Sequence, residues 1–301
     1  MQISITADEK INALSKPKQT PSIKPEQITH QVGFVLSGGG SKGFAHLGAI
    51  KALQEKGLSP DFISGTSAGA FSGCLLADGY LPDEIISFFD KRAFNEFGKL
   101  MIPRSGLFSS VPFYRFLHKH LRSKTFNELK VPLSVTATNL EKGNSVHFSE
   151  GLIVPPVVAS CSVPIIFKPV KIQGEHYVDG GLFKNFPVSP IRKHCRFIVG
   201  INVSPLVHRP YKENLWSIAE QSFHYMFVSN TIADKKACDL LIEIIPPDEK
   251  GYSMFDLNHT REIYELGYET AKTVIENNLN NVENIIAWQT YYKKKQEADN
   301  D

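Results

Sequence analysis

Short apolar runs alternate with helical patterns over the first third of the chain. Val32–Leu36 is an apolar run that ends at glycines, as a buried parallel strand does. Residues 42–56 carry apolar side chains at helical spacing, and Gly57 follows them as a stop signal. A second apolar pair at residues 62–63 precedes a helical pattern over residues 68–77. This β-α-β-α order predicts a parallel sheet covered by helices.

The rest of the chain continues the alternation less regularly. Residues 80–130 are expected to be largely helical, with breaks at Pro103 and Gly106. Two prolines at positions 155–156 favour the first turn of a short helix, and residues 173–175 favour a hairpin turn. The other expected elements are strands at 131–138, 146–148, 167–172, 176–178, 197–203 and 240–245, and helices at 215–236 and 261–279.

Polar segments flank this pattern at both ends. Residues 1–30 hold three prolines among polar side chains, and we interpret them as an N-terminal extension outside the core. Residues 281–301 are expected to form a helical, basic tail. No shift in composition divides the segment between them, so residues 31–280 are expected to be one catalytic domain, long enough to bury a large core.

Composition and charge exclude several classes of protein. The 301 residues are 42% hydrophobic and 21% charged, and their net charge of +2 does not suggest nucleic-acid binding. The first residues lack a secretory signal pattern, and no apolar run reaches the ~18 residues of a membrane span. We therefore expect a cytoplasmic protein, with peripheral membrane contact left open. The widely spaced Cys74, Cys161, Cys195 and Cys238 are expected to be buried thiols, with no metal site and no cofactor.

The strongest local signal for chemistry is Gly65-Thr66-Ser67-Ala68-Gly69, a G-x-S-x-G motif between an expected strand and an expected helix. This context is the one that a nucleophile elbow requires, with Ser67 exposed on a sharp turn. The flanking glycines allow close backbone packing and strained dihedral angles. The backbone N–H of Ala68 can point at a developing oxyanion. The alternative interpretation is a tight turn with an idle serine.

A second signal is the glycine-rich loop of residues 38–43, again between a strand and a helix. The backbone N–H groups of Gly38, Gly39 and Gly40 can gather around one anion, either a phosphate or an oxyanion. A dinucleotide-binding loop would need an acidic residue at the end of the second strand, whereas Asp61 stands before that strand. Lys42 either holds this loop, meets an anionic headgroup or is a solvated surface lysine.

The third signal is Asp179-Gly180-Gly181, which follows an expected strand. Alone this sequence is an ordinary turn, but a serine nucleophile needs a base within hydrogen-bond reach, and Asp179 can supply it. A conventional triad would instead place a histidine after the aspartate in the chain. His194, His208, His224 and His259 satisfy that order, and His46 is interpreted as a packing or hydrogen-bonding histidine.

Together the three motifs resemble the patatin-like phospholipase family, in the order glycine loop, G-x-S-x-G serine and D-G-G aspartate. Ala159–Pro164 and Asp179–Pro187 are similar to two further blocks of that family, and the resemblance covers residues 32–205. It implies a three-layer α/β/α domain with a central, mainly parallel sheet, and a Ser67–Asp179 dyad without histidine. It also implies that Gly38, Gly39, Gly40 and Ala68 form the oxyanion site. Lys42 departs from the arginine that many relatives carry there.

The resulting hypothesis is a serine acyl hydrolase that cleaves fatty-acyl esters of phospholipids through an acyl-enzyme, without metal or cofactor. The alternatives are hydrolysis of soluble acyl esters or thioesters on the same dyad, and a lipid-binding module without catalysis. The sequence leaves the role of two segments open between two interpretations. Residues 108–121 are either a flap over the acyl chain or a core helix, and residues 288–295, with Trp288 and three lysines, are either a membrane contact or a solvated helix end.

Overall fold

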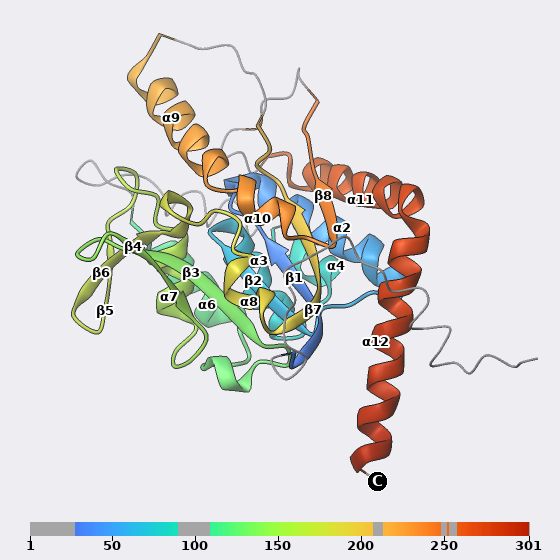
Figure 1. Cartoon of the computed structure of the whole chain (residues 1–301). Coiled ribbons are helices and arrows are strands. Elements are labelled where there is room, and N and C mark those ends of the chain that lie inside the picture. The colour runs from blue at the N-terminus through green and yellow to red at the C-terminus, as the bar shows by residue number, and fades with distance from the viewer. Residues whose placement is uncertain (1–27, 90–108, 207–212, 248–251, 253–257, 301) are drawn as a thin grey trace, which may run out of the picture.

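A mixed sheet of eight strands lies at the centre of the described part of the chain (Figure 1). This computed structural model describes residues 28–89, 109–206, 213–247, 252 and 258–300. The strand order is β5-β6-β3-β2-β1-β7-β8, and β4 also pairs with β3. The strands are β1 (His30–Leu36), β2 (Phe62–Thr66), β3 (Leu133–Asn139), β4 (Asn144–Phe148), β5 (Val170–Ile172), β6 (Glu175–Asp179), β7 (Cys195–Asn202) and β8 (Leu240–Glu243).

The sheet is mainly parallel, as the sequence predicts. Strands β3, β2, β1, β7 and β8 run parallel to their neighbours in this series, whereas β4, β5 and β6 pair antiparallel. The carboxyl ends of the parallel strands therefore meet at one edge, where ligand sites of open α/β sheets form. The predicted hairpin joins β5 to β6 through Gln173 and Gly174, which both have positive φ angles.

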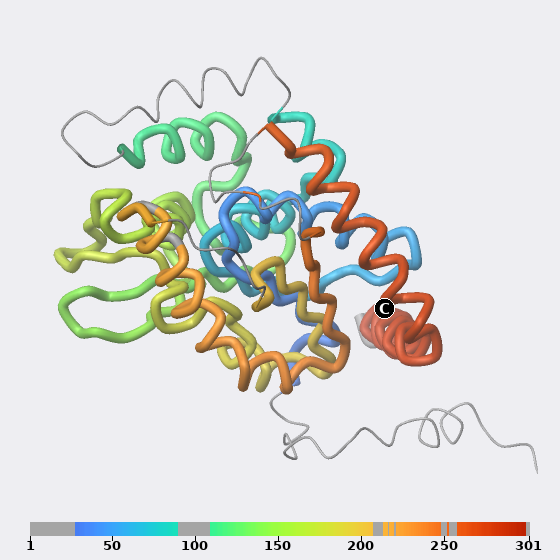
Figure 2. Tube along the Cα trace, turned by 90° about the horizontal axis from the view of Figure 1, so that it is seen from above, coloured from blue at the N-terminus to red at the C-terminus, as the bar shows by residue number. Residues whose placement is uncertain are grey.

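Helices cover both faces of the sheet, so the predicted three-layer α/β/α arrangement is confirmed. Figure 2 shows helices on either side of the strands in a view turned by 90°. The helices are α2 (Phe44–Glu55), α3 (Ala68–Ala77), α4 (Pro82–Ser87), α6 (Val111–His120), α7 (Val154–Ser160), α8 (Ser189–Arg192), α9 (Leu215–Ser229), α10 (Ile232–Lys236), α11 (Thr260–Asn277) and α12 (Leu279–Asn300), with 3-10 turns η2 (Gly40–Gly43), η3 (Phe126–Glu128) and η4 (Gly180–Leu182).

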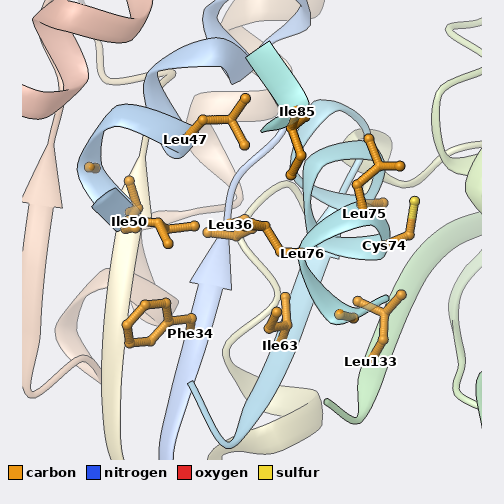
Figure 3. Packing of buried hydrophobic residues seen from close by; sticks show 14 of the residues in the cluster. Phe34, Leu36, Leu47, Ile50, Ile63, Cys74, Leu75, Leu76, Ile85 and Leu133 are labelled. Atoms are coloured by element: carbon orange, nitrogen blue, oxygen red, sulfur yellow. The ribbon is translucent and has the colours of Figure 1, made fainter. Parts of the chain in front are cut away.

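Alternation along β1 sends its side chains into two cores. Phe34 and Leu36 belong to the larger cluster, together with side chains of α2 and α3 (Figure 3). Val35 points to the opposite face and packs in a smaller cluster with Phe186 and Ile191. Each face buries apolar side chains from helices or loops, which is the main source of stability for a fold of this kind.

Glycines let helices α2 and α11 cross in close contact. A Cβ atom on Gly48 would lie 1.9 Å from the carbonyl oxygen of Tyr264, and one on Gly267 would lie 2.1 Å from that of Ala45. No larger residue fits at either position without separating the two backbones. The crossing fixes helix α11 on the face of the sheet that also carries α3, and side chains of both helices belong to the larger cluster.

Several element boundaries differ from those expected. The helix expected over residues 215–236 is broken into α9 and α10, because Asn230 and Thr231 turn the chain between them. The helix expected from residue 42 begins with the 3-10 turn η2 before α2 starts at Phe44. The breaks expected at Pro103 and Gly106 lie outside the described residues.

Residues 108–121 and 288–295, whose roles the sequence left open, both contain helical residues. The core interpretation of residues 108–121 is supported, because Leu117 of α6 is fully buried and Phe113 packs against the core, while Phe108 lies outside the described residues. In the tail, Trp288 of α12 stacks on Arg196 at 3.7 Å. The division into extension, domain and tail stays a prediction. No helix in the described ranges has both the length and the apolar character to cross a bilayer.

Candidate active site

Ser67 stands on a sharp turn between β2 and α3. Its φ and ψ angles are 52° and −121°, a conformation that few non-glycine residues adopt. The motif glycines make this turn possible. A Cβ atom on Gly65 would lie 2.5 Å from the carbonyl oxygen of Gly69, and one on Gly69 would lie 2.2 Å from that of Leu36. The predicted nucleophile elbow is therefore present, and it depends on backbone packed directly against backbone.

Asp179 comes to this turn from the end of β6. Ala137 on β3 pairs with Asp179 in the antiparallel register, so one strand separates the aspartate from β2. The Ser67 hydroxyl donates a hydrogen bond of 2.6 Å to Oδ2 of Asp179, although the two residues are 112 positions apart. The backbone N–H of Gly181 donates to Oδ1 at 2.8 Å. The structure thus brings together the two residues that the sequence proposes as a dyad.

Burial tunes the Asp179 carboxyl group. The side chain is fully buried, and the loss of hydration raises its pKa to about 7. The hydrogen bonds from Ser67 and Gly181 favour the carboxylate and oppose part of this rise. A carboxyl group with a pKa near neutrality can exchange protons with a serine hydroxyl more readily than an ordinary aspartate can.

Ser160 supports the elbow, although no sequence motif indicated a role for it. Its hydroxyl oxygen accepts a hydrogen bond of 2.8 Å from the backbone N–H of Ser67. The same hydroxyl donates to the carbonyl oxygen of Thr136 at 2.6 Å. This fully buried serine therefore connects the elbow to β3. Its place in the Ala159–Pro164 block was the available signal, but spacing alone did not reveal the partner.

The glycine-rich loop lies against the elbow, as expected, but its N–H groups are not equivalent. A Cβ atom on Gly38 would lie 3.1 Å from Cβ of Ser67, and one on Gly43 would lie 2.7 Å from Cβ of Ala68. The N–H of Gly38 donates to the carbonyl oxygen of Asn185 at 3.0 Å. Gly38 is therefore engaged in holding the loop, and Gly39 and Gly40 are the better candidates among the three for binding an anion.

The described histidines do not complete a triad. Within the described residues, the Asp179 carboxylate receives its hydrogen bonds from Ser67 and Gly181, and no histidine bonds to it. His208 lies outside those residues. His46 is fully buried, and its Nε2–H donates to the carbonyl oxygen of Ser37 at 2.9 Å, because a carbonyl can only accept. Burial lowers the pKa of His46 to about 4, which keeps the ring neutral and supports its structural role.

The position of Asp61 and the burial of Lys42 decide two further interpretations of the sequence. Asp61 lies at the start of β2, at the opposite end of that strand from Ser67, and its carboxylate accepts from the backbone N–H of Val32 at 3.0 Å. It is therefore a structural residue and does not serve a dinucleotide. The interpretation of Lys42 as a solvated surface lysine is wrong, because only 8% of its surface is exposed.

Asn230 links helix α9 to residues 180–185, which we call the aspartate loop because they follow Asp179. Nothing in the local sequence indicated this link. Its Oδ1 accepts from the backbone N–H of Asn185 at 2.8 Å, and its Nδ2 donates to the carbonyl oxygen of Gly181 at 2.7 Å. The aromatic ring of Phe227, one turn earlier, lies against Gly181. The segment that carries Asp179 is thus fixed from one side by the end of α9.

The arrangement is that of an activated serine. A hydroxyl on a strained turn, a buried carboxylate at 2.6 Å and a helix N-terminus at Ala68 are the components of acyl transfer by a serine nucleophile. Across the described ranges, no three His, Cys, Asp or Glu side chains gather closely enough to hold a metal ion.

A family model and several known proteins are similar to this chain. A family model described as "Patatin-like phospholipase" matches residues 34–191. The chain is 27% identical over 268 residues to the lysophospholipase NTE1 of Kluyveromyces lactis, which covers 79% of this chain and 18% of that protein. It is 29% identical over 164 residues to an uncharacterized NTE family protein of Mycobacterium bovis, covering 54% of this chain and 45% of that protein. The chain therefore spans less than half the length of either relative.

Two solved structures have lower similarity. VipD from Legionella pneumophila has a TM-score of 0.47 and 18% identity, over 83% of this chain and 67% of that one. Human GIVD cytosolic phospholipase A2 has a TM-score of 0.47 and 10% identity, over 94% of this chain and 65% of that one.

Proposed function

The chain belongs to the patatin-like phospholipase family, and from that premise we propose that it hydrolyses fatty-acyl esters of phospholipids or lysophospholipids through Ser67 and Asp179. The observation that carries the proposal is the 2.6 Å hydrogen bond from the serine hydroxyl to the buried carboxylate. The relative named a lysophospholipase supports a lipid ester as substrate. Diacyl and monoacyl phospholipids present the same scissile ester, so both belong to the proposed class.

The proposed reaction has two steps on one serine. In the first, Oγ of Ser67 attacks the ester carbonyl carbon while its proton passes to Asp179, and the protonated Asp179 then returns that proton to the departing alcohol. In the second, Asp179 takes a proton from water as the water oxygen attacks the acyl-enzyme. The fatty acid then leaves, and the proton held by Asp179 returns to Ser67. Asp179 thus exchanges one proton in each step and ends in its starting state.

Backbone N–H groups are proposed to stabilise the oxyanion formed in each step. Ala68, at the start of α3, would contribute its N–H together with the positive end of the helix dipole. Gly39 and Gly40 would contribute from the facing loop, whereas Gly38 would act through its hydrogen bond to Asn185. This proposal keeps the expected residues of the oxyanion site but separates donors to the substrate from a residue that supports the loop.

The decisive experiment is the release of fatty acid from phosphatidylcholine and lysophosphatidylcholine vesicles or micelles by wild type, Ser67→Ala and Asp179→Asn. Both variants are expected to lose at least ~10³-fold in kcat, as other hydrolases do when their nucleophile or base is removed. Ser72→Ala, on the same helix as the elbow, and Asp83→Asn, at the start of α4, are matched controls and should retain most activity.

Three outcomes would overturn the proposal. If Asp179→Asn keeps most of the activity, the base is another group and the dyad is wrong. If wild type hydrolyses soluble short-chain esters or thioesters but releases nothing from either lipid, the substrate class is wrong. Failure to react with a fluorophosphonate probe, which needs an activated serine, would favour a lipid-binding module without catalysis. A cytoplasmic location stays a prediction, which fractionation of cells would test.

A further inference from the structure

Helix α9 presents an uncharged, apolar face to solvent. Leu215 is 84% exposed, Ile218 is 45% exposed and Tyr225 is 47% exposed, at intervals of three and seven residues that place them on one face. Met226 is 37% exposed beside them. We call these four residues the α9 face. Among the side chains of α9 that the structure describes, the other exposed positions are Ser222 and Ser229, so none of these described exposed positions is charged.

Helix α11 shows what an ordinary solvent-facing helix of this chain looks like. Its exposed positions include Arg261, Glu265, Glu269, Lys272 and Glu276, which are all charged. The contrast matters because water solvates charged side chains well, whereas exposing several large apolar side chains in one stripe has a free-energy cost that burial in an apolar medium removes. The α9 face is therefore suited to an apolar medium rather than to water.

At its other end, helix α9 contacts the aspartate loop. Asn230, which caps α9, bonds to the backbone of Gly181 and Asn185, and Phe227 packs on Gly181. The loop itself carries an exposed apolar side chain, Phe183, which is 48% exposed four residues after Asp179. The apolar surface of α9 is thus attached to the segment that delivers Asp179.

We propose that the α9 face inserts into the surface of a phospholipid bilayer and holds the Ser67–Asp179 site against it. This inference rests on the proposed function, because a lipid acyl hydrolase must draw its substrate from a lipid surface. A helix that lies in such a surface buries its apolar face among acyl chains and headgroups. The absence of charge on the α9 face favours a bilayer entered through apolar contacts over a partner recognised by ion pairs.

The basic tail is a poor alternative contact. Helices α9 and α12 extend to opposite sides of the sheet in both views (Figures 1 and 2). The lysines of residues 293–295 belong to α12, so they lie on a different helix and on the other side of the sheet from the α9 face. The two contacts also differ in their response to salt, since apolar insertion is insensitive to it and attraction of lysines to anionic lipid is screened.

The test is co-sedimentation with phosphatidylcholine vesicles in low and high NaCl. The double variant Leu215→Glu/Ile218→Glu is expected to bind about tenfold more weakly or worse, because it places charge where apolar side chains would be buried. Leu279→Glu, at the start of α12 and equally apolar, with 44% of its surface exposed, is the matched control and should bind like wild type. Binding by wild type should change little with salt.

A second measurement separates this inference from the proposed function. Hydrolysis of a monomeric short-chain ester should be the same for wild type and the double variant, while hydrolysis of vesicles falls in parallel with binding. If the double variant binds vesicles as tightly as wild type does, the inference is overturned and the proposed function still stands. A change confined to self-association, measured by sedimentation velocity, would also overturn the inference, because a second copy of the chain would then cover the face. If wild type hydrolyses no ester at all, the proposed function is refuted instead.

Discussion

The elbow around Ser67 and the junction around Asn230 hold the two halves of the dyad by different means. At the elbow, backbone lies on backbone, and Gly65 and Gly69 leave no room for a methyl group. At the junction, three hydrogen bonds of the Asn230 side chain and one aromatic ring connect α9 to the loop that follows Asp179. The proposed nucleophile is thus fixed by the main chain, whereas the proposed base is fixed partly by side chains that can be exchanged without rebuilding the fold.

Gly69→Ala should have the largest effect, because it attacks the elbow directly. The new methyl group would lie 2.2 Å from the carbonyl oxygen of Leu36, a backbone atom held in the sheet. We expect a loss of ~5 kcal/mol or more in the free energy of unfolding, enough to prevent folding of a domain of ordinary stability. Urea denaturation followed by circular dichroism measures it.

Gly73→Ala is the control for that prediction. It lies on the same helix, and its methyl group would meet the side chain of Ile63 at 3.1 Å. A side chain can adjust, and alanine favours the helix by ~1 kcal/mol relative to glycine, so the net change should be under ~1 kcal/mol. Equal stability of the two variants would show that the elbow tolerates a side chain after all.

The pH dependence of Asp179 tests the other half of the dyad. Because burial raises the pKa of Asp179 to about 7, kcat/KM should rise through pH 7 as the base ionises. The folded state binds a proton that the unfolded state has released between the ordinary value of 3.8 and about 7, so this group makes stability fall as pH rises across that interval.

Asp179→Asn removes that titration and should therefore gain stability over wild type as pH rises from about 4 to about 7. The rise of the Asp179 pKa from 3.8 to about 7 corresponds to a few kcal/mol, on the order of 4 at most. Thermal unfolding of both proteins at pH 5 and pH 8 measures the difference. A constant difference between the two pH values would mean that Asp179 is not the group with the raised pKa.

Asn230→Ala should have the smallest effect, because it removes side-chain contacts only. We expect kcat to fall about tenfold with KM unchanged, since one or two hydrogen bonds of ~1 kcal/mol position the loop. The hydrogen bond from Gly181 lowers the pKa of Asp179, so loosening this loop should also move the acidic limb of the rate profile to higher pH. Kinetics across pH 5–9 would measure both changes.

Asn278→Ala provides a matched control for the junction. Asn278 also caps a helix, α11, and its Nδ2 donates to the carbonyl oxygen of Val274 at 2.8 Å, but no bond joins it to the aspartate loop. Its loss should leave kcat and the acidic limb unchanged. The same small decrease in both variants would reduce Asn230 to an ordinary helix cap.

The sequence predicted the features that depend on near neighbours. The helix over Ala68–Ala77 and the turn at Ser67 follow from residues within a few positions, so the expected boundaries of that helix are those observed. The D-G-G motif singled out Asp179, and the resemblance paired it with a serine 112 positions away, which spacing alone could not do. The predicted mainly parallel sheet is confirmed, and its strand β1 is the short apolar run that precedes the glycine loop.

The features that escaped prediction depend on distant partners. Ser160 bonds to Ser67 across 93 positions, and Asn230 bonds to Asn185 across 45. Gly38 donates to Asn185, 147 positions away, so its different role within the glycine loop was invisible to local reasoning. The break between α9 and α10 was missed because the helical pattern continues through Ser229 and Ile232, while Thr231 bonds back to Val228.

The long sequence separation within the dyad also has a kinetic consequence. Ser67 and Asp179 meet only when β3 has paired with β2 on one side and with β6 on the other. Such non-local pairings form slowly, because distant parts of the chain must first be brought together. Helices α2 and α3 can form earlier, from local contacts. Recovery of activity after dilution from denaturant should therefore lag behind recovery of helical signal, and enzyme assays would report the closing of the sheet.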